Sequence, residues 1–346
     1  MFLTLNTLQA NGKAKEHKIR WCLTFFVIMI FRMVDEVMAV ESINWMAGGP
    51  QGSGVDTAAN IFARACGYGG LYVFGRREYH SNIKGLHSYF HLRISKKETL
   101  SNVNAIELLA AFDAETVIRH IKEVTPGGGI IVDTKQLTLK VLEIPTLPCE
   151  YKTEIQKFMK ENSIGETLND WLNYAKRNGI EIFTVPYEQI LTDIAPKIGI
   201  TQIGKMVRII NVLTVGISFA LLKFDKQLVE KAVRSVFAEK EKIAEMNAFA
   251  VNFSYDYAEK NFQGNFKHKL EKLEINEDRI FLTGNQAVAI GKVAGGCRVQ
   301  TYYPITPAAD ESEYLEANEI IKTSNGEEAV LVIQSEDEIA AINTAS

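Results

Sequence analysis

The sequence has few cysteines, no paired metal-binding spacing and no excess of positive charge. Its four cysteines, Cys22, Cys66, Cys149 and Cys297, are far apart. They form no CxxC or CxH pair, so the sequence carries no signature of a zinc site or an iron–sulfur cluster. We therefore expect no metal on this chain, and isolated reduced thiols as in a cytoplasmic protein. The net charge of −4 provides no basic field and argues against a nucleic-acid partner.

The first 40 residues lack a hydrophobic run long enough to cross a membrane. The mostly apolar run between Arg20 and Arg32 has 11 residues, whereas a spanning helix needs roughly 20. A basic segment precedes this run, as in a signal peptide, but no small-residue cleavage site follows it. Over a membrane or targeting role we favour a third interpretation. In it the native start is Met33 or Met38, and residues 1–40 are an extension.

The rest of the composition is ordinary for a soluble globular protein, with 47% hydrophobic and 23% charged residues. A chain of 346 residues is long enough for two domains. One later run, residues 203–222, is apolar and as long as a membrane span. Because Lys205, Arg208 and Lys223 lie in or beside it, we interpret it as a buried or interface helix and expect no membrane partner.

Residues 41–262 alternate between strand-like and helix-like patterns, which predicts a largely parallel, doubly wound α/β domain. Residues 134–179 interrupt the alternation and are interpreted as an insertion with a helix at 166–178. We interpret residues 76–85 as a polar loop and Gly127–Gly129 as a plain turn. The predicted elements are strands at 42–47, 71–75, 88–95, 106–112, 129–133 and 180–185, and helices at 55–66, 114–124, 187–198, 227–237 and 238–262.

A glycine-rich loop, Gly48–Gly54, connects the first strand to the first helix. Such a loop directs backbone N–H groups and a helix N-terminus toward an anion. A Walker loop would need Lys after its glycine, where Val55 stands, and a dinucleotide fingerprint would need Gly or Ala at Thr57. The loop therefore predicts either an anion or cofactor contact, or a tight turn or subunit contact. The candidate residues are Gly49, Gln51, Gly52 and Gly54.

Three histidines, His80, His87 and His91, follow one another closely in the sequence. They span a loop and a strand without a carboxylate partner pattern, so a metal site is not favoured. We expect surface or hydrogen-bonded histidines.

Residues 263–276 are polar and charged and are interpreted as a linker to an incomplete second domain, residues 277–346. The domain is small, with an open sheet edge. Its predicted elements are strands at 279–283, 298–303 and 329–334, and helices at 285–295, 307–323 and from Ser335 onward.

Two strand ends of this second domain deliver polar groups to helix starts. Tyr302–Pro307 follows one strand, and Gln334–Glu338 follows another. Ligands of α/β proteins bind at such strand ends. Local rules also explain both stretches: Thr306 before Pro307 predicts a helix cap, and Ser335 with Glu338 predicts a capping box.

These residues carry a resemblance to a known family. Residues 303–307, 310–312 and 334–343 resemble the alpha subunit of archaeal-type 2-oxoacid:ferredoxin oxidoreductases, in which a gamma domain precedes the pyrimidine-binding domain of a thiamine-diphosphate enzyme. Residues 48–54 and 77–83 are similar to that gamma domain. The resemblance covers residues 41–346. The chain departs from the family by its N-terminal extension and by stopping about halfway through the alpha subunit, before the positive contact expected for the substrate carboxylate.

The resemblance implies residue roles. Glu336 would promote the aminopyrimidine tautomer that removes the C2 proton of thiamine diphosphate, and its carboxyl, buried beside the ring, would have a perturbed ionisation. Thr306, with Tyr303 and Pro304 beside it, would contact the 2-oxoacid carboxylate or coenzyme A.

The resemblance also implies partners, because the chain lacks both a Gly-Asp-Gly motif and a cluster-binding cysteine set. The magnesium ion, the diphosphate site and a 4Fe-4S cluster are then expected on a beta subunit that reduces ferredoxin. This chain alone is expected to be inactive. Two alternatives stay open: a non-catalytic assembly or coenzyme A-binding module, and a nicotinamide- or flavin-binding oxidoreductase that uses Gly48–Gly54.

Overall fold

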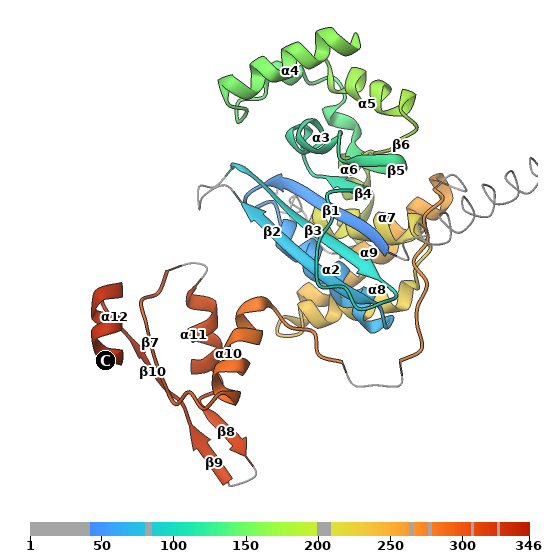
Figure 1. Ribbon diagram of the computed structural model, residues 1–346. Helices are drawn as coiled ribbons and strands as arrows, with labels where there is room; N and C mark the ends of the chain where they lie inside the picture. The colour runs from blue at the N-terminus through green and yellow to red at the C-terminus, as the bar shows by residue number, and fades with distance from the viewer. Residues whose placement is uncertain are drawn as a thin grey trace, which may run out of the picture. The chain divides into compact units, whose positions relative to one another are not determined.

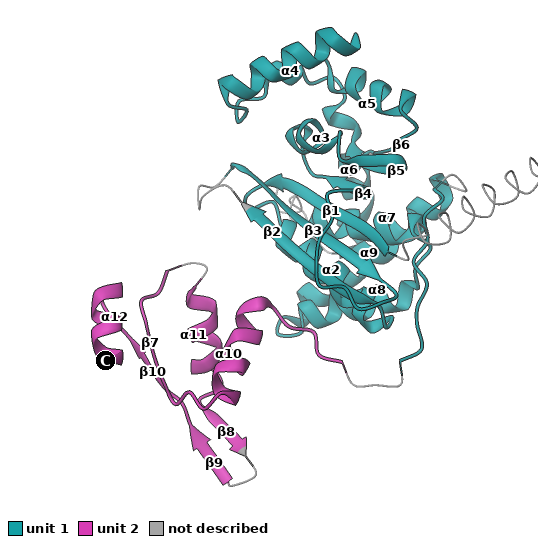
Figure 2. Cartoon of the chain, in the orientation of Figure 1, with its two compact units in different colours: residues 1–275 teal, residues 276–346 magenta. Residues whose placement is uncertain are grey.

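The computed structural model describes residues 42–79, 85–198, 209–262, 266–275, 279–305, 308–323 and 326–346. The extension 1–40 and the predicted contact residue Thr306 lie outside these ranges. The chain divides into two compact units, residues 1–275 and 276–346 (Figure 2). Each unit is described by itself.

Unit 1 is built on one six-stranded sheet in the order β2-β3-β1-β4-β5-β6. Strands β1, β4, β5 and β6 pair in parallel in that order. Strand β3 is antiparallel to β1, and β2 is antiparallel to β3. The α/β class is thereby confirmed, with an antiparallel edge added to the parallel sheet. The strands are β1 (Ser42–Pro50), β2 (Tyr72–Tyr79), β3 (His87–Ser95), β4 (Ile106–Ala111), β5 (Val124–Asp133) and β6 (Glu181–Val185).

Helices cover both faces of this sheet (Figure 1). One face carries α2 (Val55–Tyr68), α6 (Tyr187–Ile194), α7 (Ile210–Leu221), α8 (Lys226–Val236) and α9 (Glu241–Asn261). The other carries α3 (Ala114–His120), α4 (Cys149–Asn162) and α5 (Leu168–Arg177). Short 3-10 turns lie at Thr134–Gln136, Val141–Glu143 and Ala195–Ile198.

Aromatic stacking anchors the first of these faces. The Phe62 ring of α2 stacks between Trp45 of β1, with centroids 4.3 Å apart, and Phe219 of α7, at 4.1 Å. The Trp45 indole N–H donates to Ser218 Oγ at 3.1 Å, which satisfies its one polar atom inside the core. Eleven of the twelve residues of α7 are buried, so the described part of the apolar run 203–222 is confirmed as a buried helix.

Two local expectations in unit 1 were wrong, and strand pairing explains both. Residues 76–79, expected in a loop, continue β2, because β2 stays paired with β3 as far as Tyr79 opposite Ser88. Gly127–Gly129, expected as a plain turn, lies inside β5, and Gly129 pairs with both neighbouring strands. In addition, α3 ends at His120 rather than at Val124, where β5 begins.

Residues 266–275, which fall in the predicted linker, lie against unit 1. Phe266 and Leu270 are buried in its core. The backbone N–H of Leu270 donates to the Leu222 carbonyl at 2.9 Å, and that of Leu273 donates to the Gly69 carbonyl at 2.7 Å. This segment is therefore held on unit 1 by both apolar burial and backbone hydrogen bonds.

Unit 2 contains two small sheets rather than one. Strand β7 pairs in parallel with β10, and β8 forms an antiparallel hairpin with β9. Its elements are α10 (Gly284–Ala294), β7 (Val299–Tyr302), α11 (Ala309–Glu316), β8 (Ile320–Thr323), β9 (Gly326–Ala329), β10 (Leu331–Gln334) and α12 (Glu338–Ala345).

Three expectations for unit 2 were wrong. Residues 279–283 form no strand: Ile280 and Phe281 are exposed, and Thr283 instead caps α10 in a capping box with Gln286. The helix expected over 307–323 begins at Ala309 and ends at Glu316, because residues 320–323 pair with β9. The last helix begins at Glu338 rather than at Ser335.

Candidate functional site

The two strand ends singled out in the sequence lie side by side in unit 2. Because β7 and β10 are parallel and Tyr302 pairs with Gln334, both strands end at the same edge. The backbone N–H of Ser335 donates to the Tyr302 carbonyl at 2.7 Å and extends the ladder by one residue. Residues 303–305 and 335–337 therefore leave the sheet from neighbouring positions, which is the arrangement that places ligands in α/β proteins.

Glu336 is an exposed residue between this strand end and α12. The expected capping box of Ser335 with Glu338 does not form, because the Ser335 backbone still belongs to the strand pair. Asp337 caps the helix instead, and its carboxylate accepts the backbone N–H of Ala340 at 2.6 Å. Within the described part of the chain, the Glu336 carboxylate has no hydrogen-bond or ion-pair partner. Unit 2 alone does not provide the buried setting expected for acid–base work.

The other strand end turns sharply after β7. The Ile305 N–H donates to the Tyr303 carbonyl at 2.9 Å, and the Ala309 N–H at the start of α11 donates to the Ile305 carbonyl at 2.9 Å. Tyr303 is half-buried, whereas Pro304 and Ile305 are exposed. The turn thus presents its backbone and side chains at the same edge as Glu336.

Polar contacts next to this edge hold α10, α11 and α12 against β7. The Lys292 ammonium donates to Gln300 Oε1 at 3.1 Å and pairs with Glu311. The Gln300 amide donates to the Ser312 hydroxyl at 3.1 Å, and the Thr301 hydroxyl donates to the Ala341 carbonyl at 2.8 Å. These bonds fix the position of β7, and with it the positions of Tyr302 at its end and of Tyr303, which follows.

The glycine-rich loop lies at the equivalent edge of unit 1. Helix α2 leaves β1 toward one face of the sheet, and α3 leaves β4 toward the other, so the loop occupies a topological switch point where α/β folds bind ligands. Gly52 and Gly54 have φ of +93° and +92°, which glycine adopts without strain. Gly49 is packed closely: a Cβ there would lie 2.8 Å from the Phe112 Cβ.

The beginning of α2 is not capped by a side chain of its own. Gly54 occupies the N-cap position, and Asn211 at the start of α7 donates its amide to the Gly54 carbonyl at 3.1 Å. The Gln51 N–H donates to the Leu86 carbonyl at 2.8 Å, which ties the loop to the residue preceding β3. The Asn211 contact joins residues 157 positions apart, and no local sequence signal could have shown it.

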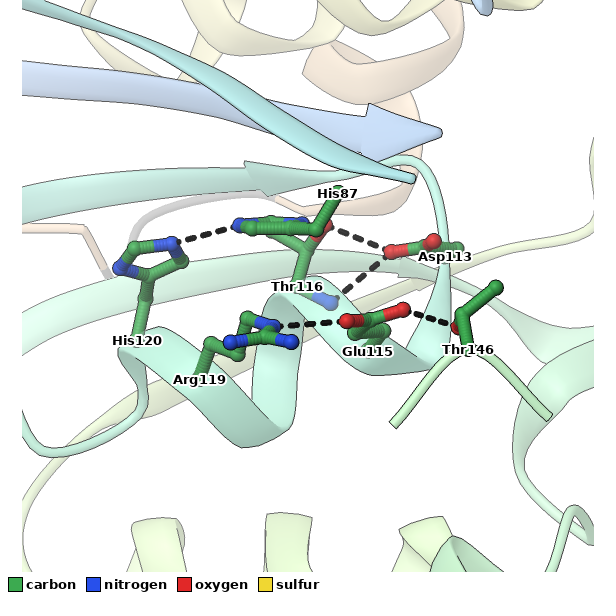
Figure 3. A network of polar contacts seen from close by, with 7 residues as sticks. All are labelled: His87, Asp113, Glu115, Thr116, Arg119, His120 and Thr146. Atoms are coloured by element: carbon green, nitrogen blue, oxygen red, sulfur yellow. Dashed lines mark hydrogen bonds and ion pairs between the residues drawn. The ribbon is translucent and has the colours of Figure 1, made fainter. Parts of the chain in front are cut away.

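His87 of β3 and His120 at the end of α3 meet in a buried polar cluster (Figure 3). His87 and His91 are buried, and His87 Nε2 lies 3.0 Å from Nε2 of His120, whose Nδ1 lies 3.1 Å from Glu123. Burial lowers the pKa of His91 to about 4, and Arg76 and His120 act in the same direction against Glu123. The expectation of surface or hydrogen-bonded histidines is confirmed for His87, which contacts His120, and for His91, which has a backbone hydrogen bond at Ala105. Both are buried, and His80 lies outside the described residues.

The same figure shows how α3 begins. Asp113 accepts the backbone N–H of Thr116 at 2.8 Å and its hydroxyl at 2.6 Å, and Glu115 binds Arg119 at 2.7 Å and the Thr146 hydroxyl. Burial raises the pKa of the Asp113 carboxyl, and the Thr116 bonds oppose that shift. Asp113 and Glu115 are thus both hydrogen-bonded by neighbouring side chains, whereas the buried His91 Nε2 has no hydrogen-bond partner among the described residues.

Within the described ranges, no group of three or more His, Cys, Asp or Glu residues is arranged to hold a metal ion. The same ranges contain no helix that is long and apolar enough to cross a membrane.

The fold is α/β, with a six-stranded sheet in unit 1 and two parallel strand ends at one edge in unit 2. Residues 44–257 match the model of the family described as pyruvate ferredoxin/flavodoxin oxidoreductase. Residues 290–346 match the thiamine diphosphate-binding domain of pyruvate flavodoxin/ferredoxin oxidoreductase. The first match covers more than half of the chain, so the chain belongs to the pyruvate ferredoxin/flavodoxin oxidoreductase family, and the resemblance stated from the sequence is confirmed.

Two curated relatives are alpha subunits of 2-oxoacid:ferredoxin oxidoreductases. The chain is 39% identical, over 88% of its length, to the 2-oxoacid:ferredoxin oxidoreductase subunit alpha of Saccharolobus solfataricus, and it covers 48% of that protein. It is 32% identical, over 87% of its length, to subunit alpha of 2-oxoacid:ferredoxin oxidoreductase 2 of Aeropyrum pernix, again covering 48%. The chain thus spans about half the length of these curated relatives.

A solved structure is similar in fold. It is the 2-oxoglutarate:ferredoxin oxidoreductase of Magnetococcus marinus with 2-oxoglutarate, coenzyme A and succinyl-CoA bound. The likeness has a TM-score of 0.63 at 20% identity and covers 88% of this chain and 45% of that one. At this identity the likeness supports the fold alone.

Proposed function

We propose that this chain supplies part of the alpha subunit of a 2-oxoacid:ferredoxin oxidoreductase. Such an enzyme converts a 2-oxoacid and coenzyme A to an acyl-CoA and CO2 and reduces ferredoxin. The observation that carries the proposal is the parallel pairing of β7 with β10, which places Tyr303 and Glu336 at one edge inside the segment that matches the thiamine diphosphate-binding domain. The names of the curated relatives support the same activity.

The residues at this edge fit the pyrimidine end of thiamine diphosphate. The Glu336 carboxylate is exposed and is not used to cap α12, since Asp337 does so. It is therefore free to bind a ring nitrogen. The diphosphate and magnesium end does not fit the described part of this chain, where no metal-binding group occurs. The chain would hold only one end of the cofactor.

When bound, thiamine diphosphate supplies the carbon nucleophile that attacks the 2-oxoacid carbonyl. Glu336 would hold a proton at its carboxyl and exchange it with the far nitrogen of the aminopyrimidine. Enclosure by the cofactor and a second subunit would remove the carboxyl from water and hold it against the ring nitrogen.

The turn after β7 would position the acidic substrate. Tyr303 and Pro304 line the edge, and Thr306 follows them in the sequence. A hydroxyl and backbone N–H groups near the start of a helix suit a carboxylate or the phosphates of coenzyme A. We assign Gly49, Gln51, Gly52 and Gly54 to the contact of the gamma-type domain with a ligand or a neighbouring subunit.

The remaining groups would come from partners. A beta subunit would hold the magnesium ion, the diphosphate and a 4Fe-4S cluster, and it would pass electrons to ferredoxin. If the beta subunit holds the metal and the diphosphate, this chain needs only Glu336 for the ring nitrogen, and its described part needs no metal-binding group.

Reconstitution tests the proposal. The chain, and a version extended to the full length of its curated relatives, would each be mixed with a beta subunit of the Saccharolobus solfataricus enzyme. Viologen reduction would be followed with pyruvate or 2-oxoglutarate. We expect coenzyme A-dependent reduction by the extended version and none by the present chain alone. Absence of activity in the extended version, once its assembly with the beta subunit is shown, would contradict the proposal. Saturable binding of a nicotinamide or flavin, lost in Gly52→Val, would contradict it as well.

A further inference from the structure

Glu336 is held between two attached residues, one at the strand end and one at the start of α12. Ser335 is attached to the strand end, because its backbone N–H donates to the Tyr302 carbonyl at 2.7 Å. Asp337 is the cap of α12. Consecutive Cα atoms are about 3.8 Å apart, so each attachment lies one peptide unit from Glu336. The place of the Glu336 carboxylate therefore depends on how α12 is fastened to the sheet.

Thr301 of β7 fastens α12 to the sheet. Its hydroxyl donates to the Ala341 carbonyl at 2.8 Å, although the two residues are 40 positions apart in the chain. Thr301 is half-buried, and Ala341 is buried. Ile339 and Ile342 of the same helix are 71% and 70% exposed. Burial of apolar side chains therefore contributes little to the attachment of α12, so the hydrogen bond of Thr301 matters more.

The backbone of Thr301 belongs to the same strand pair that positions the two strand ends. It pairs with Ile333 of β10, at the next-to-last position of the ladder. The Thr301 hydroxyl therefore fixes α12 relative to both strands. At the start of α12, the Asp337 carboxylate accepts the Ala340 N–H at 2.6 Å, so the cap moves with the helix.

We propose, resting on the function proposed above, that Thr301 is a positioning residue for the acid–base chemistry of Glu336. It acts by holding α12 on β7, so that the Glu336 carboxylate stays at the edge shared with Tyr303. Proton exchange needs its two heavy atoms about 2.6–3.2 Å apart. A misplacement of about 1 Å can cost on the order of 100-fold in rate. With α12 unfastened, the carboxylate would reach the ring nitrogen for only part of the time.

The test variant is Thr301→Val, which keeps the branched shape of the side chain and removes its hydroxyl donor. Thr301→Ser keeps the donor and serves as the rescue variant. The matched control is Thr344→Val. The Thr344 hydroxyl donates to the Ala340 carbonyl at the same distance of 2.8 Å, but both residues belong to α12. The control therefore loses an equal hydrogen bond that does not join α12 to β7.

The variants are made in the full-length enzyme reconstituted with its beta subunit. Thr301→Val is expected to lower kcat for coenzyme A-dependent viologen reduction by about tenfold and to change KM for the 2-oxoacid by less than about twofold. Exchange of the C2 proton of bound thiamine diphosphate with deuterium, followed by acid quench and proton NMR, should slow by a similar factor. Thr301→Ser and Thr344→Val should stay close to the native enzyme in both measurements.

A further readout needs neither cofactor nor turnover. In the same reconstituted enzyme without thiamine diphosphate, hydrogen exchange of the peptide that contains α12 should be faster in Thr301→Val than in Thr344→Val. Size-exclusion chromatography checks that each variant still assembles with the beta subunit.

The positioning role of Thr301 can fail while the proposed function stands. If Glu336→Gln is inactive but Thr301→Val keeps the native kcat and the native C2 exchange, only the role of Thr301 is overturned. Equal losses in Thr301→Val and Thr344→Val, or unchanged hydrogen exchange of α12 in Thr301→Val, would overturn it as well. Full turnover in Glu336→Gln would instead contradict the acid–base role of Glu336 itself.

Discussion

At the scale of single residues, the sequence predicted that Glu336 lies at a strand end, but it did not predict which residue caps the helix that follows. Glu336 was expected at a strand end, and it lies there. Its neighbour Asp337, rather than Ser335, turned out to cap the helix, because the backbone of Ser335 is held by a strand whose partner lies more than 30 residues away. Capping rules consider only residues close in the sequence, so they do not include such a distant partner.

The buried His91 gives unit 1 a dependence on pH. Its pKa is lowered to about 4 in the folded chain and is about 6.5 in the unfolded chain. Between these values the unfolded state binds more protons. The free energy of unfolding is therefore greatest above pH 6.5 and falls as the pH drops toward 4, by up to about 3 kcal/mol.

Urea unfolding at a series of pH values would measure this slope. In His91→Leu the part of the slope that belongs to His91 should disappear, because leucine binds no proton. An identical pH dependence in the native chain and in the variant would contradict the burial of a neutral imidazole at this position.

At the scale of elements, apolar periodicity was enough to find most strands and helices of unit 1. It failed where pairing extended an element, as in β2, and where a glycine triplet lies inside β5. It also failed in unit 2, where residues 320–323 pair with β9 in a hairpin instead of continuing α11. The contact of Asn211 with Gly54 depends on the fold of the whole unit.

The glycine-rich loop offers a matched pair of substitutions. Gly52 and Gly54 have almost the same positive φ, so alanine at either site costs about 1–2 kcal/mol of backbone strain. A Cβ at Gly52 would meet open space, whereas a Cβ at Gly54 would lie 2.1 Å from the Asn211 Nδ2. Gly54→Ala should therefore destabilise the chain by about 1–3 kcal/mol more than Gly52→Ala.

Thermal or urea unfolding of the two variants would test this difference. Adding Asn211→Ala to Gly54→Ala should recover part of the loss, since the clash is removed. Equal destabilisation by the two glycine substitutions would show that Asn211 does not lie over the beginning of α2.

At the scale of the whole molecule, the two units differ in how much apolar surface they bury. Unit 1 has two extensive cores. In the described part of unit 2 the buried hydrophobic residues are Ala289, Ala309, Leu315, Val330 and Ala341, while ten large hydrophobic residues are exposed. The parallel sheet of β7 and β10 has only two strands, and sheets of that size are marginally stable in water.

Hydrogen exchange should therefore differ between the units. Backbone amides of β7 and β10 are expected to exchange much faster than those of β1 and β4, which lie inside a covered six-stranded sheet. Mass spectrometry of peptides from the intact chain would measure both at once. Protection of β7 and β10 equal to that of β1 would contradict the small core of unit 2.

We propose that the ends of β7 and β10 form one side of a thiamine diphosphate site with Glu336 as its acid–base residue. The most direct test compares Glu336→Gln with Glu338→Gln in the full-length enzyme reconstituted with its beta subunit. Both substitutions remove one exposed carboxylate from the same short segment. We predict that Glu336→Gln lowers coenzyme A-dependent viologen reduction by about 100-fold or more while subunit assembly is retained, and that Glu338→Gln has little effect. Retained turnover in Glu336→Gln, or equal losses in both variants, would contradict the account.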